Sequence, residues 1–272
     1  MSQHASSPAR GSAPRPPLRI LLAEDNVTNQ KLAVAILEKQ GHTIKVVADG
    51  KQAIEAYERE LFDVVLMDMQ MPEVDGLEAT SAIRSLEKSS GRHTPIIALT
   101  ANAMIGDRER CLNSGMDEYL SKPLRADDLF ATIERLVVTQ ALTTTTPQGQ
   151  DNSGSASNAI FDYKTSVQQV GDDPELLSQL VAVFLEQLPL LLPPLETAVA
   201  TNDAKAIRQA AHALCSSVSV IAAPRAKDIA RKLELMGLNS ELDRVRETHA
   251  ELLSEFSALQ QVLNTTPSLK AA

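Results

Sequence analysis

Two hydrophobic patterns divide this chain into two parts. In the first part, short apolar runs alternate with amphipathic stretches, and glycines or polar residues separate them. A short continuous apolar run is typical of a strand that is buried on both faces of a parallel sheet. In the second part, apolar residues recur at helical spacing with only short interruptions. The pattern therefore predicts an α/β domain followed by an all-helical domain.

The first domain is predicted to span residues 18–139. Its strands are predicted at Leu18–Ala23, Thr43–Val47, Phe62–Met67, Pro95–Leu99 and Glu118–Leu120. The helices that follow them are predicted to run from a cap at Asn26 to Gln40, and over Lys51–Glu60, Gly76–Lys88, Ala103–Asn113 and Arg125–Val138. This alternation specifies a doubly wound, five-stranded parallel sheet with helices on both faces.

The second domain is predicted to span residues 159–265. Its helices are predicted at Phe161–Val170, Asp173–Gln187, Pro189–Thr201, Asp203–Ile221, Pro224–Met236 and Glu241–Leu263. Pro189 is expected in the first turn of its helix, and Gly237 is expected to end one. Short connections between these helices predict an antiparallel bundle of about four main helices. Residues 1–17, 140–158 and 266–272 are expected to be a disordered tail, a flexible linker and a C-terminal tail.

Polar side chains follow four of the predicted strands, namely Glu24 and Asp25, Asp68, Thr100 and Lys122. The carboxyl ends of parallel strands meet at the sheet edge where such sheets bind ligands. Three carboxylates in one pocket repel one another unless a hard divalent cation lies between them, and oxygen ligands suit Mg²⁺. Two acids and a lysine can also form a structural ion pair, but an ion pair does not explain the hydroxyl and the ammonium on two further strand ends. The sequence therefore predicts a magnesium site.

These residues lie in four motifs, which read LLAEDN, LMDMQMPEVDG, ALTAN and YLSKP in chain order. In order and spacing the motifs resemble the receiver domain of two-component response regulators, and most of all the receivers of hybrid histidine kinases. The resemblance implies a flavodoxin-like fold in which Asp68 is the phosphoacceptor. It also implies that Mg²⁺ is held by Glu24, Asp25, Asp68 and the backbone carbonyl of Gln70.

The resemblance assigns the phosphoryl group two further contacts, an ion pair with Lys122 and a hydrogen bond with Thr100. Tyr119 would be the aromatic switch residue, turning inward when Thr100 moves toward the phosphoryl group, although a half-buried aromatic at a strand end explains Tyr119 equally well. The helix around Met104–Arg110 would form part of the partner surface. The bond between Lys122 and Pro123 is expected to be cis, as it is in that family.

His212 carries the second resemblance. Its helix places it on a polar face beside the apolar stripe, so we expect it to be exposed to solvent. The surrounding AHALCSSVSVIAAPRAKDIARKLE resembles the histidine phosphotransfer (Hpt) domain, in which this histidine carries the phosphoryl group. Cys215 stands where that family has Lys, and Ser216 stands where it has Gly, although Arg208 could replace the missing charge. His212 is therefore either an active phosphotransfer residue or part of a degenerate docking bundle.

Composition restricts the classes of function that this chain can have. A net charge of -9 argues against a general nucleic-acid binder, and the two cysteines, Cys111 and Cys215, lack metal-ligand spacing. The most apolar run, Leu188–Leu195, is too short to span a bilayer, so we expect a cytoplasmic protein without a membrane anchor. The sequence contains no recognisable ATP-binding motif, so a histidine kinase, either simple or hybrid, would supply the phosphoryl group.

Three functions from different classes follow from these features. The first is a phosphorelay protein, whose bundle passes the phosphoryl group to or from a receiver, such as that of a downstream response regulator or another effector. The second is a phosphorylation-controlled binding switch with an inactive bundle. The third is a phosphatase with an Asp nucleophile, but that chemistry needs a second Asp where this chain has Gln70.

Overall fold

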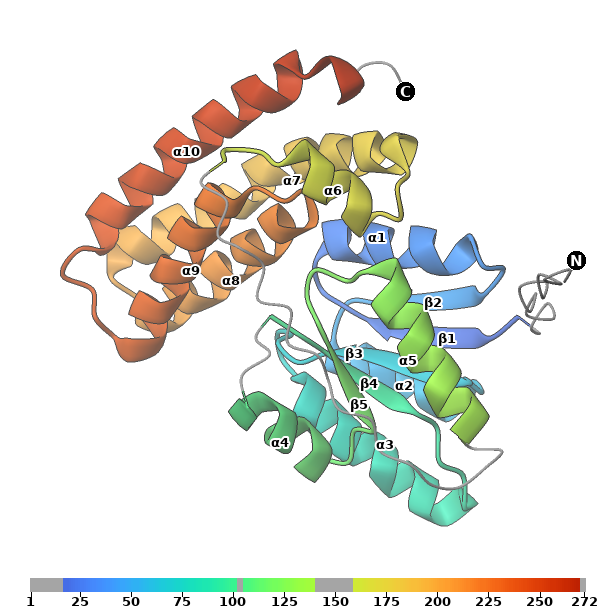
Figure 1. Cartoon of the computed structure of the whole chain (residues 1–272). Helices are drawn as coiled ribbons and strands as arrows, with labels where there is room; N and C mark the ends of the chain where they lie inside the picture. The colour runs from blue at the N-terminus through green and yellow to red at the C-terminus, as the bar shows by residue number, and fades with distance from the viewer. Residues whose placement is uncertain (1–16, 102–104, 140–158, 270–272) are drawn as a thin grey trace, which may run out of the picture.

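The computed structural model describes residues 17–101, 105–139 and 159–269 of the chain. The predicted linker and almost all of the predicted N-terminal tail therefore lie outside the described residues. Figure 1 shows the two parts of the chain, with the sheet and its helices below and a helical bundle above.

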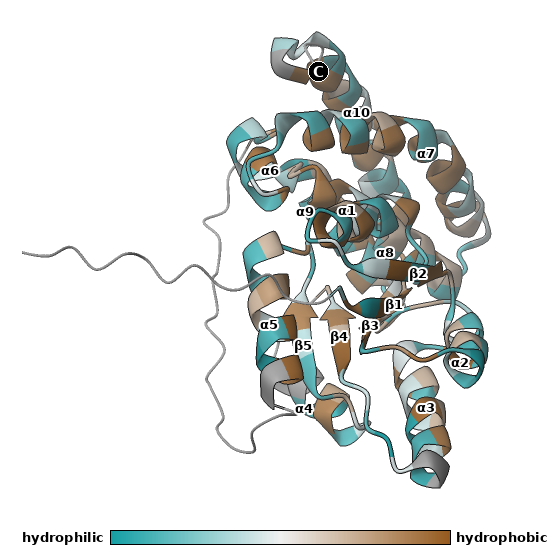
Figure 2. Cartoon of the chain, turned by 90° about the vertical axis from the view of Figure 1, so that its right-hand side faces the viewer, coloured by the Kyte–Doolittle hydropathy of each residue, from teal (hydrophilic) through white to brown (hydrophobic). Residues whose placement is uncertain are grey.

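The first part is the predicted five-stranded parallel sheet. The strands are β1 (Arg19–Ala23), β2 (Thr43–Val47), β3 (Val64–Asp68), β4 (Ile96–Thr100) and β5 (Glu118–Ser121). They are hydrogen-bonded in the order β2-β1-β3-β4-β5, and every neighbouring pair is parallel. Because β3 lies in the centre, all of its residues are buried. Figure 2 shows the apolar colouring of β4, which is paired with β3.

Five helices cover the two faces of the sheet. They are α1 (Val27–Glu38), α2 (Gly50–Arg59), α3 (Gly76–Ser90), α4 (Ile105–Asn113) and α5 (Ala126–Thr139). Alternate residues of β1 belong to different cores: Ile20 and Leu22 pack with α1 and α5, whereas Leu21 and Ala23 pack with α2, α3 and α4. This alternation is the period of two that a strand requires. The predicted cap is confirmed, because the Asn26 side chain accepts hydrogen bonds from the backbone N–H groups of Thr28 and Asn29.

The second part is helical throughout. Its elements are α6 (Tyr163–Gln169), α7 (Pro174–Thr201), α8 (Ala204–Val220), α9 (Pro224–Asn239), α10 (Val245–Thr265) and a short 3-10 turn, η1 (Pro267–Leu269). The predicted bundle is confirmed, with α7 to α10 as its long helices. The chain end differs from the predicted tail, because the Ser178 hydroxyl donates to the carbonyl of Leu269 at 2.7 Å and so ties η1 to α7.

Two of the predicted helix boundaries are wrong. α7 runs through Pro189, Pro193 and Pro194 without a break. Leu188 and Leu195, on either side of the prolines, are both buried in the bundle core, so packing outweighs the lost backbone hydrogen bonds. Gly237 does not end α9 but lies inside it, because the helix continues to a left-handed cap at Ser240.

By length and composition, one helix in the described ranges could cross a membrane. This helix is α7, whose most apolar window has a mean hydropathy of 1.6 and is 33% buried. Core helices of soluble bundles often have this length and hydropathy. The buried side chains of α7 include Leu180, Phe184 and Leu188, which belong to the bundle core.

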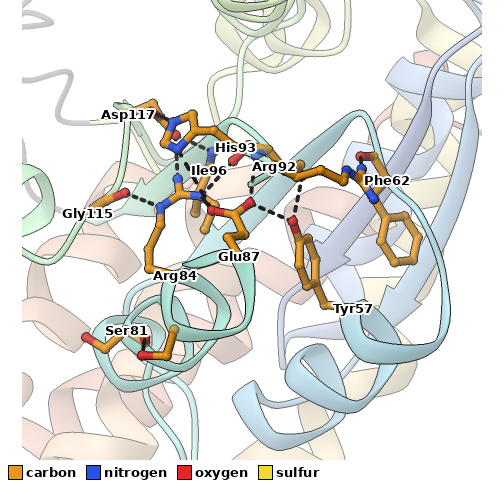
Figure 3. A network of polar contacts seen from close by, with 12 residues as sticks. Tyr57, Phe62, Ser81, Arg84, Glu87, Arg92, His93, Ile96, Gly115 and Asp117 are labelled. Atoms are coloured by element: carbon orange, nitrogen blue, oxygen red, sulfur yellow. Dashed lines mark hydrogen bonds and ion pairs between the residues drawn. The ribbon is translucent and has the colours of Figure 1, made fainter. Parts of the chain in front are cut away.

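A polar network joins α3 to the amino edge of the sheet (Figure 3). The Arg84 guanidinium donates to Glu87 Oε2 at 2.5 Å, to Asp117 Oδ2 at 2.6 Å and to the carbonyls of Thr94 and Gly115 at 2.9 and 2.7 Å. The Tyr57 hydroxyl donates to Glu87 Oε1 at 2.6 Å. The network lies at the start of β4 and β5, at the opposite edge from the carboxyl end of β3, so it stabilises the fold away from the predicted site.

The two parts of the chain touch along α1. One side of α1 covers the sheet, and α1 also contacts α7 and α8 of the bundle (Figure 1). The carboxyl ends of the strands therefore lie close to the bundle helix that carries His212.

Candidate functional site

The structure brings the predicted acidic residues and the lysine together at the carboxyl edge of the sheet. Lys122 Nζ lies 2.6 Å from Asp68 Oδ2 and 2.7 Å from Glu24 Oε2. Carboxylate oxygens of Glu24, Asp25 and Asp68 all lie within 4.8 Å of one another. Glu24, Asp68 and Lys122 are buried, so these charges interact with little screening by solvent.

The negative charge of the site exceeds what one lysine can offset. Burial and, second, the neighbouring Asp68 carboxylate raise the pKa of Glu24 to about 8, although Lys122 and Asn29 oppose the rise. Burial also raises the pKa of Asp25 to about 6, with Asp68 as the second cause. Burial alone would lower the pKa of Lys122, but Asp68 and Glu24 raise it above its ordinary value. A divalent cation with oxygen ligands fits this set of donors.

Two local contacts fix Asp68 at the end of β3. The backbone N–H of Gln70 donates to Asp68 Oδ1 at 3.1 Å. A Cβ at Gly76 would lie 2.2 Å from the carbonyl oxygen of Asp68, so the following loop can approach β3 only with glycine at this position. The role of the Gln70 carbonyl as a metal ligand stays a prediction.

Thr100 and Tyr119 lie on the adjacent strands. Thr100 ends β4, is buried, and pairs with Ser121 in register. Tyr119 is partly buried and packs against the core under α2, α3 and α4. The peptide bond between Lys122 and Pro123 is cis, as expected. The switch roles of Thr100 and Tyr119 stay predictions, and Met104 lies outside the described residues.

His212 is buried, with only 9% of its surface exposed, so the expectation that it faces solvent is wrong. The helix period alone could not reveal that α9 and the first domain would cover this face of α8. His212 Nδ1 lies 3.0 Å from Glu234 Oε1, and Arg231 donates to Glu234 Oε2 at 2.7 Å. Burial alone would raise the pKa of Glu234, but these hydrogen bonds hold it below its ordinary value.

The ionised Glu234 determines which nitrogen of His212 can react. A carboxylate only accepts hydrogen bonds, so Nδ1 of His212 carries the proton in this pair. The lone pair of the neutral ring is then on Nε2, so Nε2 is the ring nitrogen that is able to act as a nucleophile. Sequence reasoning missed Glu234 and Arg231. The available signal was the helix period, which places the acidic Glu234 on the same face as Ala230 and Leu233, and in the structure this face is buried.

The structure explains the environment of the two unusual residues after His212. Cys215 is buried, and burial raises the pKa of its thiol to about 11, so it is a neutral residue in place of the usual lysine. Positive charge near Cys215 comes from Lys227 and Arg231 of α9. Ser216 is also buried, and its hydroxyl lies 3.4 Å from Nδ2 of Asn29 in the first domain. The suggestion that Arg208 supplies the missing charge stays a prediction.

Asn26 connects the acidic cluster with the His212 helix. Its Nδ2 donates to the carbonyl of Ala213 at 3.1 Å and to the hydroxyl of Ser217 at 2.7 Å. His212 is close enough to Asp25 to oppose the rise in its pKa. A small cavity of about 140 Å³ lies between these elements and is lined by Asp25, Asn26, Ala213 and Ser217, among others. The structure therefore brings the two predicted phosphoryl-carrying residues into one region.

Comparison with known protein families agrees with both resemblances. Residues 20–134 match the family model of the response regulator receiver domain. Residues 179–262 match the family model of the Hpt domain.

Individual relatives match either nearly all of this chain or less than half of it. The chain is 31% identical over 255 residues to the aerobic respiration control sensor protein ArcB of Escherichia coli (strain K12). This alignment covers 92% of this chain and 32% of that protein. It is 48% identical over 122 residues to hybrid signal transduction histidine kinase I of Dictyostelium discoideum, over 43% of this chain and 7% of that protein. The chain thus spans well under two thirds of these curated relatives.

Among solved structures, the chain is similar to the receiver domain of sensor histidine kinase PA1611 from Pseudomonas aeruginosa PAO1, which has a magnesium ion in its active site cleft. The identity is 46% and the TM-score 0.42, over 45% of this chain and 99% of that one.

Proposed function

Because this chain joins a receiver domain to an Hpt domain, we propose that it is a phosphorelay protein in which Asp68 and His212 carry the phosphoryl group in turn. The observation that carries the proposal is the contact between the two sites, in which the residue after Asp25 is hydrogen-bonded to the helix of His212. The matches to both family models support it.

The transfer requires in-line displacement at phosphorus. When Asp68 accepts the group, its carboxylate oxygen forms the new P–O bond, the P–N bond of the donor phosphohistidine breaks, and the donor nitrogen keeps the electron pair. When His212 accepts it, Nε2 forms the P–N bond and the carboxylate of Asp68 leaves with its electron pair. The ammonium of Lys122, which contacts Asp68 at 2.6 Å, balances charge on the phosphoryl oxygens.

Glu24, Asp25 and Asp68 would hold Mg²⁺, together with the backbone carbonyl of Gln70. A bound divalent cation would supply charge neutralisation at the phosphoryl oxygens. The raised pKa values of Glu24 and Asp25, about 8 and 6, support this assignment because they arise from burial and from the nearby Asp68 carboxylate, and a bound cation would offset both effects.

The proposed partners are a histidine kinase, which phosphorylates Asp68, and a downstream response regulator or other effector, which exchanges the group with His212. The names of the relatives, a sensor protein and a hybrid histidine kinase, support partners of this class. We place the protein in the cytoplasm, without direct contact with nucleic acid or membrane.

The alternative, a binding switch with an inactive bundle, is less well supported. The hydrogen bond between His212 and Glu234 leaves Nε2 available as a nucleophile, which a docking platform has no need to preserve.

Phosphorylation by a small phosphodonor tests the proposal. In the presence of Mg²⁺, acetyl phosphate should add a phosphoryl group to the wild-type protein, as measured by intact mass spectrometry. Asp68→Asn should abolish this modification, whereas Asp63→Asn, at the exposed amino end of the same strand, should not. Unchanged labelling of the Asp68→Asn protein, or labelling that is independent of Mg²⁺, would contradict the proposal.

A further inference from the structure

We propose that Asn26 is a specificity residue that docks the Hpt domain onto the receiver domain of the same chain, so that phosphoryl exchange between Asp68 and His212 proceeds within one molecule. The docking contact can be tested by itself, whereas its consequence for exchange rests on the proposed function.

The side chain of Asn26 uses its two ends for different tasks. Its Oδ1 caps α1, accepting from the backbone N–H groups of Thr28 and Asn29 at 3.0 and 3.2 Å. Its Nδ2 donates to the carbonyl of Ala213 at 3.1 Å and to the hydroxyl of Ser217 at 2.7 Å. The cap fixes the orientation of the amide, so the donor end is already directed at α8 before the domains meet.

The acceptor site on α8 is buried and complementary to this donor. Ser217 is completely buried, and its hydroxyl donates to the Ala213 carbonyl at 2.9 Å. Because the hydroxyl proton is used in this hydrogen bond, the hydroxyl oxygen of Ser217 can only accept a hydrogen bond from Asn26. An incoming residue without a donor at this position would leave the Ser217 oxygen buried without its second partner, which costs free energy.

Two further polar contacts join α1 to the bundle. Asn29 Nδ2 donates to Glu24 Oε1 at 2.7 Å and lies 3.4 Å from the Ser216 hydroxyl, which links the acidic cluster to the docked bundle. At the other end of α1, Lys39 Nζ lies 3.1 Å from Asp173 Oδ2, an exposed ion pair. A cleft of about 600 Å³, lined by residues of both α1 and α7, lies between these ends.

This combination suits a domain contact that forms and opens. Polar contacts at the two ends of α1 fix the register, and the cleft between them leaves part of the surface shared by α1 and α7 unfilled. An open form is also required, because His212 is buried in the docked form and must become accessible to exchange phosphoryl groups with other proteins.

Small-angle X-ray scattering of the full chain tests the docking without any phosphoryl group. Asn26→Ser keeps a residue that caps helices well but removes the donor that reaches α8, and Ser217→Ala removes the acceptor. Ser219→Ala is the matched control, because Ser219 is also buried on α8 and its hydroxyl bonds the carbonyl four residues earlier, but it makes no hydrogen bond with α1.

The wild type and Ser219→Ala should be compact, whereas Asn26→Ser and Ser217→Ala should each lower the ratio of docked to open molecules by about tenfold and raise the radius of gyration. Equal radii for all four proteins, or an extended wild type, would overturn the proposal.

The kinetic consequence is measured by mixing chains. In the wild type, the rate of exchange between Asp68 and His212 should be independent of protein concentration and faster than exchange between a phosphorylated His212→Gln chain and an Asp68→Asn chain. The two docking variants should lose that advantage, and equal rates in the wild type and the mixture would overturn intramolecular exchange. The absence of any exchange, with the scattering result intact, would instead count against the proposed function.

Discussion

The hydrogen bond between His212 Nδ1 and Glu234 Oε1, at 3.0 Å, fixes the chemistry of the imidazole at the level of a single pair of residues. Arg231 holds the other oxygen of Glu234 at 2.7 Å, so the carboxylate has a defined orientation. His212 is thus positioned by a buried charge-assisted network, and the neutral Cys215 contributes no charge to it.

Replacing Glu234 should therefore impair phosphoryl transfer to His212. We predict that Glu234→Ala lowers the rate by about tenfold or more, the equivalent of a hydrogen bond to a charged group, whereas Glu234→Gln retains an acceptor and loses less. Nitrogen NMR of His212 should show the tautomer with the proton on Nδ1 in the wild type and a mixture of tautomers in Glu234→Ala. Glu251→Gln, an exposed change on α10, is the control. An unchanged tautomer in Glu234→Ala would contradict this assignment.

Glu87 makes the stability of the receiver domain depend on pH. Burial alone would raise its pKa, but hydrogen bonds from Tyr57, the Thr94 N–H and Arg84 hold it below the ordinary value of 4.5. The unfolded chain therefore binds more protons than the folded chain in this range, and stability falls as the pH falls below about 4.5. Urea unfolding at several pH values should show that the free energy of unfolding falls less steeply with falling pH in Glu87→Gln than in the wild type. An equal dependence of the free energy of unfolding on pH in the two proteins would contradict this role of Glu87.

At the scale of elements, α8 and α9 cross at Gly237. A Cβ at this position would lie 2.6 Å from both the carbonyl oxygen of Ala204 and the backbone nitrogen of Arg208. Gly237→Ala should thus destabilise the bundle by about 1–3 kcal/mol, although alanine is the better helix former by about 1 kcal/mol. Thermal unfolding measures the change, with the exposed Leu238→Ala as the control on the same helix. A stabilised Gly237→Ala protein would show that the helices can separate here without cost.

The elements of both domains show which features the sequence could predict and which it could not. The alternation of strands and helices and the acidic edge of the sheet followed from local patterns, because buried apolar runs and polar strand-end residues carry their own signals. Gly237 and Pro189 were misassigned, because local propensity favours a helix break at both while packing against neighbouring helices decides otherwise. The burial of His212 and the second role of Asn26 depend on how the two domains meet, which no local pattern contains.

At the scale of the whole molecule, α1 is shared by the receiver sheet and the bundle. The contact places the His212 helix beside the acidic cluster, and the buried His212 must be released before another protein can reach it. Opening and closing of this contact would therefore select between exchange within the chain and exchange with partners.

Phosphorus NMR of the wild-type protein loaded with acetyl phosphate and Mg²⁺ tests the central claim most directly, because phosphoaspartate and phosphohistidine are different chemical species. The account predicts a phosphohistidine signal that is absent from both Asp68→Asn and His212→Gln, with phosphoaspartate still formed in His212→Gln. A phosphohistidine signal that persists in Asp68→Asn, or phosphoaspartate that never gives rise to phosphohistidine in the wild type, would contradict it.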